Sequence, residues 1–128
     1  MPRGTQVTVV LENKPGQLAR MAAALKKAAV SILAISVVDS VDTGVIRMVV
    51  DSPAKAKQAL ARAKITATQQ LVLVVDLANT PGALQELSAK LSAAGVNINY
   101  VYGSVTKTGS EGLIVLGVDK LGQALKVT

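Results

Sequence analysis

The composition of this 128-residue chain narrows the range of functions before any motif is considered. It contains no cysteine and no histidine, which excludes disulfides, thiolate nucleophiles, zinc clusters built on those residues and every imidazole base. Half of the residues are hydrophobic, but no apolar run reaches the roughly 18 residues of a membrane span. We therefore expect a globular, soluble protein without cofactor or metal. No export signal is recognisable, which makes the cytoplasm the expected location.

The positive charge is concentrated in the first half of the chain. The net charge is +6, and residues 1–68 hold ten Lys or Arg against four acids, whereas residues 69–128 hold four of each. A basic surface attracts nucleic acid, and the segment with Lys55, Lys57, Arg62 and Lys64 is where such binding would occur. However, proteins that bind single-stranded nucleic acid stack its bases on aromatic side chains, and two tyrosines are the only aromatic residues of the chain. Nucleic-acid binding is therefore a minor alternative to a purely solubilising role of these lysines.

The chain contains an internal repeat. A shift of 66 residues superimposes a dense set of identities, and small changes in the shift fall between elements, as expected of a duplicated fold. The identical residues are Leu11, Asn13, Pro15, Gly16, Leu18, Ala23, Leu25, Ala28, Val30 and Ile32, which match residues 77, 79, 81, 82, 84, 89, 91, 94, 96 and 98. Two domains, residues 1–68 and 69–128, follow from this match.

The elements of the first copy are predicted from the spacing of its apolar residues. Alternating residues indicate strands, whereas recurrence every three to four residues indicates amphipathic helices. Pro15 is expected at the first position of one helix, and Ser52 is expected to cap the next, with Pro53 opening it. The expected order is strand, helix, two strands forming a hairpin, helix and strand, at residues 5–11, 15–29, 30–38, 45–50, 53–63 and 65–77.

The second copy repeats this order but ends early. Its expected elements lie at residues 71–77, 81–94, 96–105, 113–118 and from 120, with a hairpin turn at Lys107–Gly112. Tyr100 and Tyr102, two positions apart on a strand, share one face, where packing is their simplest role.

The fold class is therefore α+β: two ferredoxin-like βαββαβ modules in tandem, each with an antiparallel sheet and helices on one face, the second lacking most of its last strand. The missing strand exposes an edge near Val72 to Asp76, which we expect another chain or another part of the molecule to cover.

Two equivalent bends carry the most specific pattern in the chain, Leu-x-Asn-x-Pro-Gly, at residues 11–16 and 77–82. Each bend joins a strand to a helix N-terminus, whose unpaired amides suit a carboxylate. The expected donors are the amides of Gly16 to Leu18 and of Gly82 to Leu84. The asparagine carboxamide can accept from an ammonium group, so each bend suits a zwitterion. The alternative is that the bend is only a helix entry.

These bends, together with Ala-Gly-Val-Asn-Ile at residues 94–98, resemble the ACT domain, a small amino-acid-binding regulatory module, here as a tandem pair. The resemblance implies that modules pair side by side, as in a homodimer, and bind a free amino acid at the seam between the loop of one module and the second strand of its neighbour. The site residues that it implies are Leu11, Asn13, Gly16, Leu18, Ser31, Ile32, Leu77, Asn79, Gly82, Leu84, Asn97 and Ile98.

The chain departs from the ACT pattern at two points. Serine-binding ACT domains carry a histidine where this chain has Leu11 and Leu77, so an aliphatic or thioether amino acid suits these positions better. Ser31 corresponds to Asn97, so the two sites differ. No acid and base residues form a catalytic pair, and we expect a non-catalytic amino-acid sensor. The alternative is an interaction subunit that regulates a separate metabolic enzyme.

Overall fold

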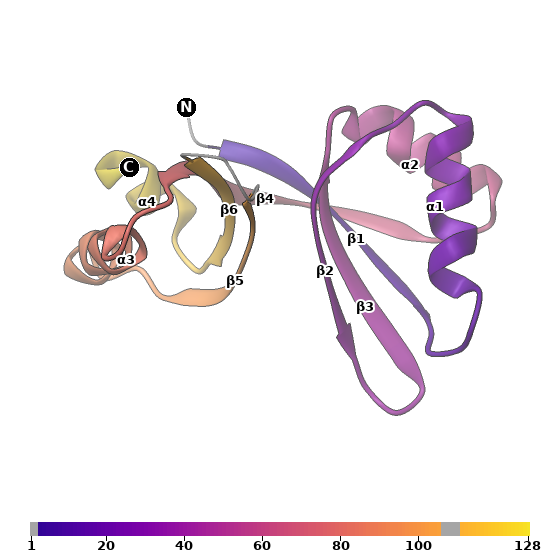
Figure 1. The fold of residues 1–128 in the computed structure, drawn as a ribbon, viewed down its shortest axis with the longest axis horizontal. Helices are drawn as coiled ribbons and strands as arrows, with labels where there is room; N and C mark the ends of the chain where they lie inside the picture. The colour runs from indigo at the N-terminus through magenta and orange to yellow at the C-terminus, as the bar shows by residue number, and fades with distance from the viewer. Residues whose placement is uncertain (1–2, 106–110) are drawn as a thin grey trace. The chain divides into compact units, whose positions relative to one another are not determined.

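The computed structural model describes residues 3–105 and 111–128 of the chain. Within these residues the structure contains ten helices and strands, and the order strand, helix, strand, strand, helix occurs twice, as expected for a tandem repeat (Figure 1). They are β1 (Arg3–Glu12), α1 (Gln17–Lys27), β2 (Ile32–Asp39), β3 (Thr43–Val50), α2 (Pro53–Arg62), β4 (Ala67–Ala78), α3 (Ala83–Ala93), β5 (Ile98–Val105), β6 (Glu111–Val118) and α4 (Leu121–Val127). None of the helices in the described ranges has both the length and the apolar character needed to cross a membrane.

The chain divides into two compact units that share the strands β1 and β4. The first unit is Thr5–Gln70, and the second runs from Leu71 to Thr128 and includes the start of β1 at Arg3 and Gly4. The units meet between Gln70 and Leu71, whereas the expected boundary lies two residues earlier, between residues 68 and 69; both positions are inside β4. Because β4 is continuous over 12 residues, one strand closes the first unit and opens the second.

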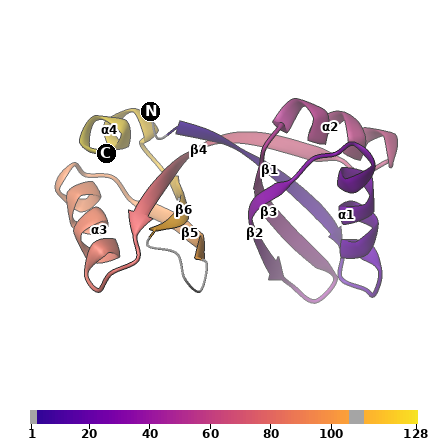
Figure 2. The ribbon, with the colours of Figure 1, turned by 45° about the horizontal axis from the view of Figure 1, so that its top comes forward.

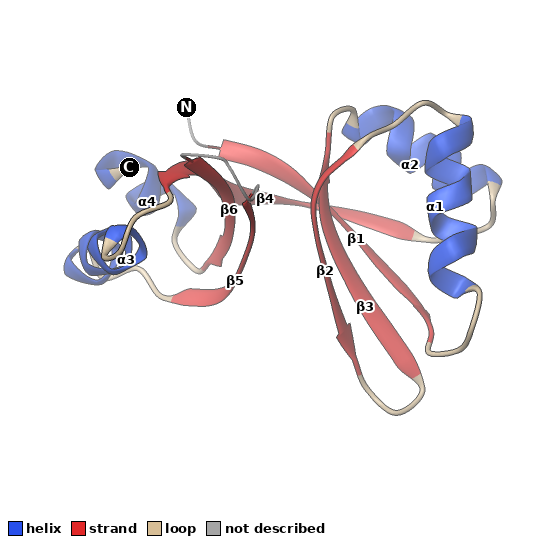
Figure 3. Ribbon diagram, viewed as in Figure 1, coloured by secondary structure: helices blue, strands red, loops and turns tan. Residues whose placement is uncertain are grey.

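The first unit buries its core between two helices and one face of a sheet (Figure 3). β3 pairs antiparallel with both β1 and β2, and the register places Val9 opposite Ile46 and Ile35 opposite Met48. The alternation in β1 sends every second side chain to the helices, where Met21, Leu25 and Leu60 meet them. Burial of this apolar surface is the main force that holds the helices on the sheet.

The second unit repeats this arrangement on its own core. β6 pairs antiparallel with β4 and β5, and α3 and α4 contact each other on one side of these strands (Figure 2). Leu73, Leu87, Leu91 and Leu116 are buried between them. Both units therefore confirm the α+β fold of tandem ferredoxin-like modules.

The start of β1 supplies the strand that the second copy lacks. No strand follows α4 in the part of the chain that the structure describes. The hydrogen-bonded order of the strands is β2-β3-β1-β4-β6-β5, so β4 has β1 as its other neighbour. Within the second unit, a β-carbon at Gly4 would collide with the side chain of Val74. The expected covering of the edge near Val72 is thus confirmed, and the cover comes from the same chain.

The helix starts differ from the expectation that Pro15 and Pro81 open their helices. α1 begins at Gln17 and α3 at Ala83, because Gly16 and Gly82 have φ values of 89° and 87° with ψ of −11°. Proline followed by a glycine of this conformation forms a type II turn, and a residue with positive φ cannot belong to a right-handed helix. By contrast, Ser52 lies at the N-cap position of α2 and Pro53 opens the helix, as expected, but the Ser52 side chain makes no capping hydrogen bond.

The two tyrosines of β5 stack on the face of the second sheet that the helices leave free. Their ring centroids lie 6.4 Å apart with an angle of 14° between the ring planes. Tyr100 pairs with Gly117 in the register, and its ring lies directly over this glycine. The expected shared face is confirmed. The expected hairpin turn that follows β5 falls largely at residues 106–110, outside the described residues.

Candidate functional site

The first bend is hydrogen-bonded to the turn between β2 and β3. The backbone amide of Asn13 donates to the Asp42 carbonyl at 2.8 Å, and Asn13 Nδ2 donates to the Ser40 carbonyl at 3.1 Å. One side-chain hydrogen of Asn13 is thus already used to hold the β2–β3 turn in place. The Oδ1 oxygen is an acceptor that this hydrogen bond does not use.

The second bend lies beside a cavity of about 160 Å³. Leu77 forms one wall, and Gly112 stands opposite it in the antiparallel register of β4 and β6. The cavity is smaller than the roughly 300–1,000 Å³ of pockets for drug-sized ligands. Its lining comprises Leu77, Ala78, Asn79, Thr80, Ala83, Leu84, Gly112 and Ile114. The counterpart of the Ser40 carbonyl in this copy lies among residues 106–110, outside the described residues.

The N-termini of α1 and α3 have no side-chain cap. In α3 the first helical bond runs from Glu86 N to the Gly82 carbonyl, and Ala83 N donates to the Thr80 carbonyl at 3.3 Å, which closes the turn. Of the expected donors Gly82 to Leu84, Ala83 is used in the turn. The donors that precede the first helical bond are therefore the amides of Leu84 and Gln85. These amides carry the positive end of the helix dipole, about half a unit charge.

The four leucines of the two motifs occupy different environments. Leu11 is only 7% exposed and belongs to the core of the first unit, whereas its counterpart Leu77 is partly buried against the core of the second unit and also lines the cavity. Leu18 and Leu84, at the starts of α1 and α3, are 49% and 47% exposed. Each bend is therefore followed by an exposed leucine, whereas Leu11 is part of the core.

The strand starts lie at the opposite end of each sheet from the bends. In the first unit, Glu12 pairs with Thr43 beside the hairpin turn, whereas Ile32 pairs with Val50 at the other end of β3. The eight residues of β2 span roughly 25 Å. The structure therefore does not bring Ser31 and Ile32 to the Asn13 bend of the same unit. By the same topology, Asn97 and Ile98 lie away from the Asn79 bend.

Two equivalent aspartates fix the strand starts. Asp51 Oδ1 accepts from the Ser31 amide at 3.0 Å, and Asp119 Oδ1 accepts from the Asn97 amide at 2.9 Å. Asn97 Nδ2 also donates to Asn99 Oδ1 at 2.9 Å. The internal repeat aligns these two aspartates at a shift of 68 residues.

Gly82→Ala is expected to lower the free energy of unfolding by about 1–2 kcal/mol, because a β-carbon disfavours the left-handed conformation. No atom lies within 4 Å of the added carbon, so the cost is purely conformational. Urea denaturation followed by circular dichroism measures it. Gly82→Asn is the matched control and should cost less, because asparagine tolerates positive φ. Equal losses for Ala and Asn would contradict this assignment.

The chain is similar to a known protein family and to several solved structures. A family model described as an ACT domain pair matches residues 4–128. The structure of protein BT0572 from Bacteroides thetaiotaomicron is similar, with 28% identity, a TM-score of 0.91, and coverage of 98% of this chain and 86% of that one. The regulatory subunit of aspartate kinase from Thermus thermophilus, in its ligand-free form, shares the fold at 17% identity and a TM-score of 0.70, with 98% and 89% coverage. Its counterpart from Thermus flavus does so at 17% identity and a TM-score of 0.62, with 99% and 90% coverage. No curated protein matches the chain.

Proposed function

Because the chain belongs to the ACT domain pair family, we propose that it is a non-catalytic regulatory protein that binds a free amino acid in the cytoplasm. The observation that carries this proposal is the cavity of about 160 Å³ beside the Asn79 bend, whose lining includes Ala83 and Leu84, the first residues of the uncapped helix α3. Two of the solved structures that share the fold are regulatory subunits of aspartate kinase, which also supports a regulatory role.

The chemistry of the bend suits the three parts of an amino acid. The amides of Leu84 and Gln85 donate to the carboxylate, and their position at the positive end of α3 favours a negative charge. The Asn79 carboxamide oxygen accepts from the ammonium group. Leu77 and Ile114 leave the side-chain part of the cavity apolar. We therefore propose an aliphatic or thioether amino acid as the ligand.

A second copy of the chain completes the site in this proposal. Ser31 and Ile32, or Asn97 and Ile98, reach a bend only from another module, because they lie at the far end of their own sheet. The outer strand β2 supports pairing between copies, since an edge strand with exposed apolar side chains calls for a cover. Leu33, Ile35 and Val37 of β2 are 48%, 41% and 53% exposed. We therefore propose a homodimer.

A thermal-shift screen of the twenty amino acids tests ligand binding. An amino acid that binds only the folded protein stabilises it by about 2.7 kcal/mol at a hundredfold excess over its Kd. One or a few aliphatic or thioether amino acids should therefore raise Tm. Leu84→Ala, which removes an exposed cavity side chain, should reduce this shift with little change in Tm without ligand. If no amino acid raises Tm at millimolar concentration, the proposal is wrong.

The second candidate is an interaction subunit of a separate enzyme of amino-acid metabolism. The observation that favours it is the fold shared with regulatory subunits of aspartate kinase and with a chain of the structure described as aspartokinase alpha and beta subunits. Analytical ultracentrifugation of the purified chain at increasing concentration distinguishes the two candidates. A stable homodimer that responds to an amino acid supports the sensor, whereas a monomer without response supports the interaction subunit.

A further inference from the structure

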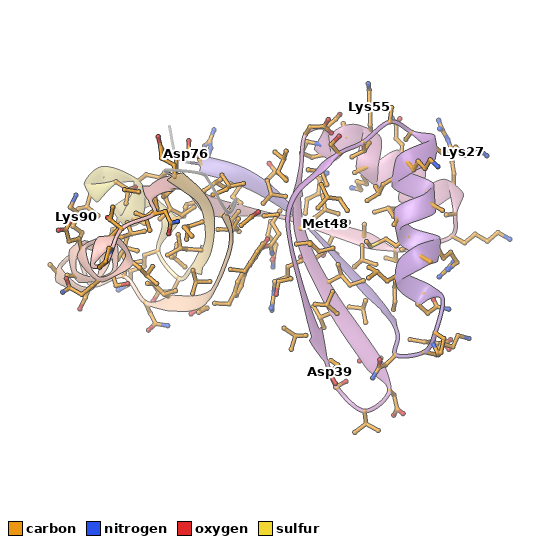
Figure 4. The ribbon with its side chains drawn as sticks, in the orientation of Figure 1. Lys27, Asp39, Met48, Lys55, Asp76 and Lys90 are labelled. Atoms are coloured by element: carbon orange, nitrogen blue, oxygen red, sulfur yellow. The ribbon has the colours of Figure 1, made fainter. Side chains whose placement is uncertain are left out.

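The helices of the first unit present a surface of one charge sign. α1, α2 and the turn after α2 contain no Asp or Glu. Lys27 and Lys55 project outward from the helices in Figure 4. The exposed cations of this surface are Arg20, Lys26, Lys27, Lys55, Lys57, Arg62 and Lys64. We refer to these seven residues as the cationic layer.

The charge of the cationic layer is not neutralised by acids of the same unit. Among residues 3–105 and 111–128, the one ion pair joins Lys14 to Glu12, and neither belongs to the layer. Arg20 donates to the Ala63 carbonyl and to Gln17 Oε1, both at 3.2 Å, so its partners are neutral. Such a surface attracts an anionic partner and accelerates its association.

A groove of about 290 Å³ runs between the two helices within the layer. Its floor consists of alanines, and Lys27 and Arg62 stand on its rim. The floor residues are Ala24, Ala28, Ala59 and Ala63. Because these side chains are small, another chain can approach the helix backbones closely and gain dispersion contacts.

The second copy keeps this pattern only in part, although it has the same fold. The internal repeat places Glu86 at the position of Arg20, Lys90 at the position of Ala24, and Ala93 at the position of Lys27. Two floor alanines recur, Ala28 as Ala94 and Ala59 as Ala124, so the small floor is partly shared by the two copies. The cationic rim is specific to the first unit, because Lys27 corresponds to Ala93 and Arg62 to Val127.

We propose that the groove of the cationic layer docks an acidic helical segment of another protein. Acidic side chains of this segment contact Lys27 and Arg62, and its small or aliphatic side chains cover the alanine floor, as in helix-in-groove recognition. A protein segment fits better than nucleic acid, because the floor is apolar and the first unit has no aromatic residue for base stacking. This docking is independent of the amino-acid site at the bends.

Fluorescence anisotropy with a labelled helical peptide of about 20 residues, composed of Glu, Ala and Leu, tests the docking at about 0.1 M salt. The double variant Lys27→Gln/Arg62→Gln should bind about fivefold more weakly, since it loses two exposed ion pairs. Lys90→Gln/Lys126→Gln removes the same charge from the second unit and should change the affinity less than twofold. Ala24→Leu, which fills the groove without changing charge, should also weaken binding.

Three outcomes would overturn the docking proposal. One is absence of peptide binding, and another is an equal loss in the two double variants, which would show attraction by net charge alone. The third is tighter binding of single-stranded or duplex DNA of similar charge, unaffected by Ala24→Leu. Circular dichroism melting shows that each variant is folded. The amino-acid thermal shift of the same variants should remain unchanged, which separates this test from that of the proposed function.

Discussion

Replacement of Leu91 by alanine is expected to lower the free energy of unfolding by about 2–5 kcal/mol. Leu91 is fully buried in α3, in contact with the apolar cluster that includes Leu73 and Leu116. The loss combines the transfer free energy of the missing atoms with the cost of the cavity they leave. Leu25, the equivalent residue of α1, is 1% exposed, and its replacement should have an effect of the same size.

Urea denaturation followed by circular dichroism measures both core variants. The controls are Leu84→Ala and Leu18→Ala, in the same two helices, where the leucines are 47% and 49% exposed. Because these side chains remain largely in water, their removal should cost less than about 1 kcal/mol. Equal losses at the buried and exposed positions would contradict the assignment of the buried faces of α1 and α3.

Replacement of Gly117 by valine is expected to cost about 1–3 kcal/mol, because a β-carbon at this position would overlap the ring of Tyr100. The ring lies over the glycine backbone and stacks on Tyr102, so it must leave this position to make room. The loss of Tm on thermal melting measures the effect. The tyrosine fluorescence should change with it, since both tyrosines of the chain belong to this stack.

Gly122 in α4 provides a matched control of opposite sign. A β-carbon there meets no atom within 4 Å, and alanine is favoured over glycine in a helix. Gly122→Ala should therefore stabilise the protein by about 0.5–1 kcal/mol.

In a Tyr100→Ala background, the cost of Gly117→Ala should fall, because the overlap is removed. If Gly117→Ala and Gly122→Ala have equal effects, the packing of Tyr100 on Gly117 is wrong.

The sequence alone determined which elements form and which faces they bury. The alternation in residues 5–11 and the helical spacing after Pro15 are local patterns, and burial of an apolar face decides the structure of such segments. The repeat of 66 residues extended the same prediction to the second copy and identified both bends. The positive φ of Gly16 was not predicted, because proline suits the first turn of a helix as well as a type II turn.

The tertiary structure alone decided which segments meet. No local pattern shows that the start of β1 pairs with β4 and replaces the missing strand, since strand pairing depends on residues far apart in the chain. For the same reason, Gly112 and Ile114 were missed as walls of the cavity: only the register of β4 and β6 places them beside Leu77. The separation of each bend from the strand start of the same unit also follows from the antiparallel topology. The direction of a strand, and not the spacing in the sequence, decides at which end of the sheet a residue lies.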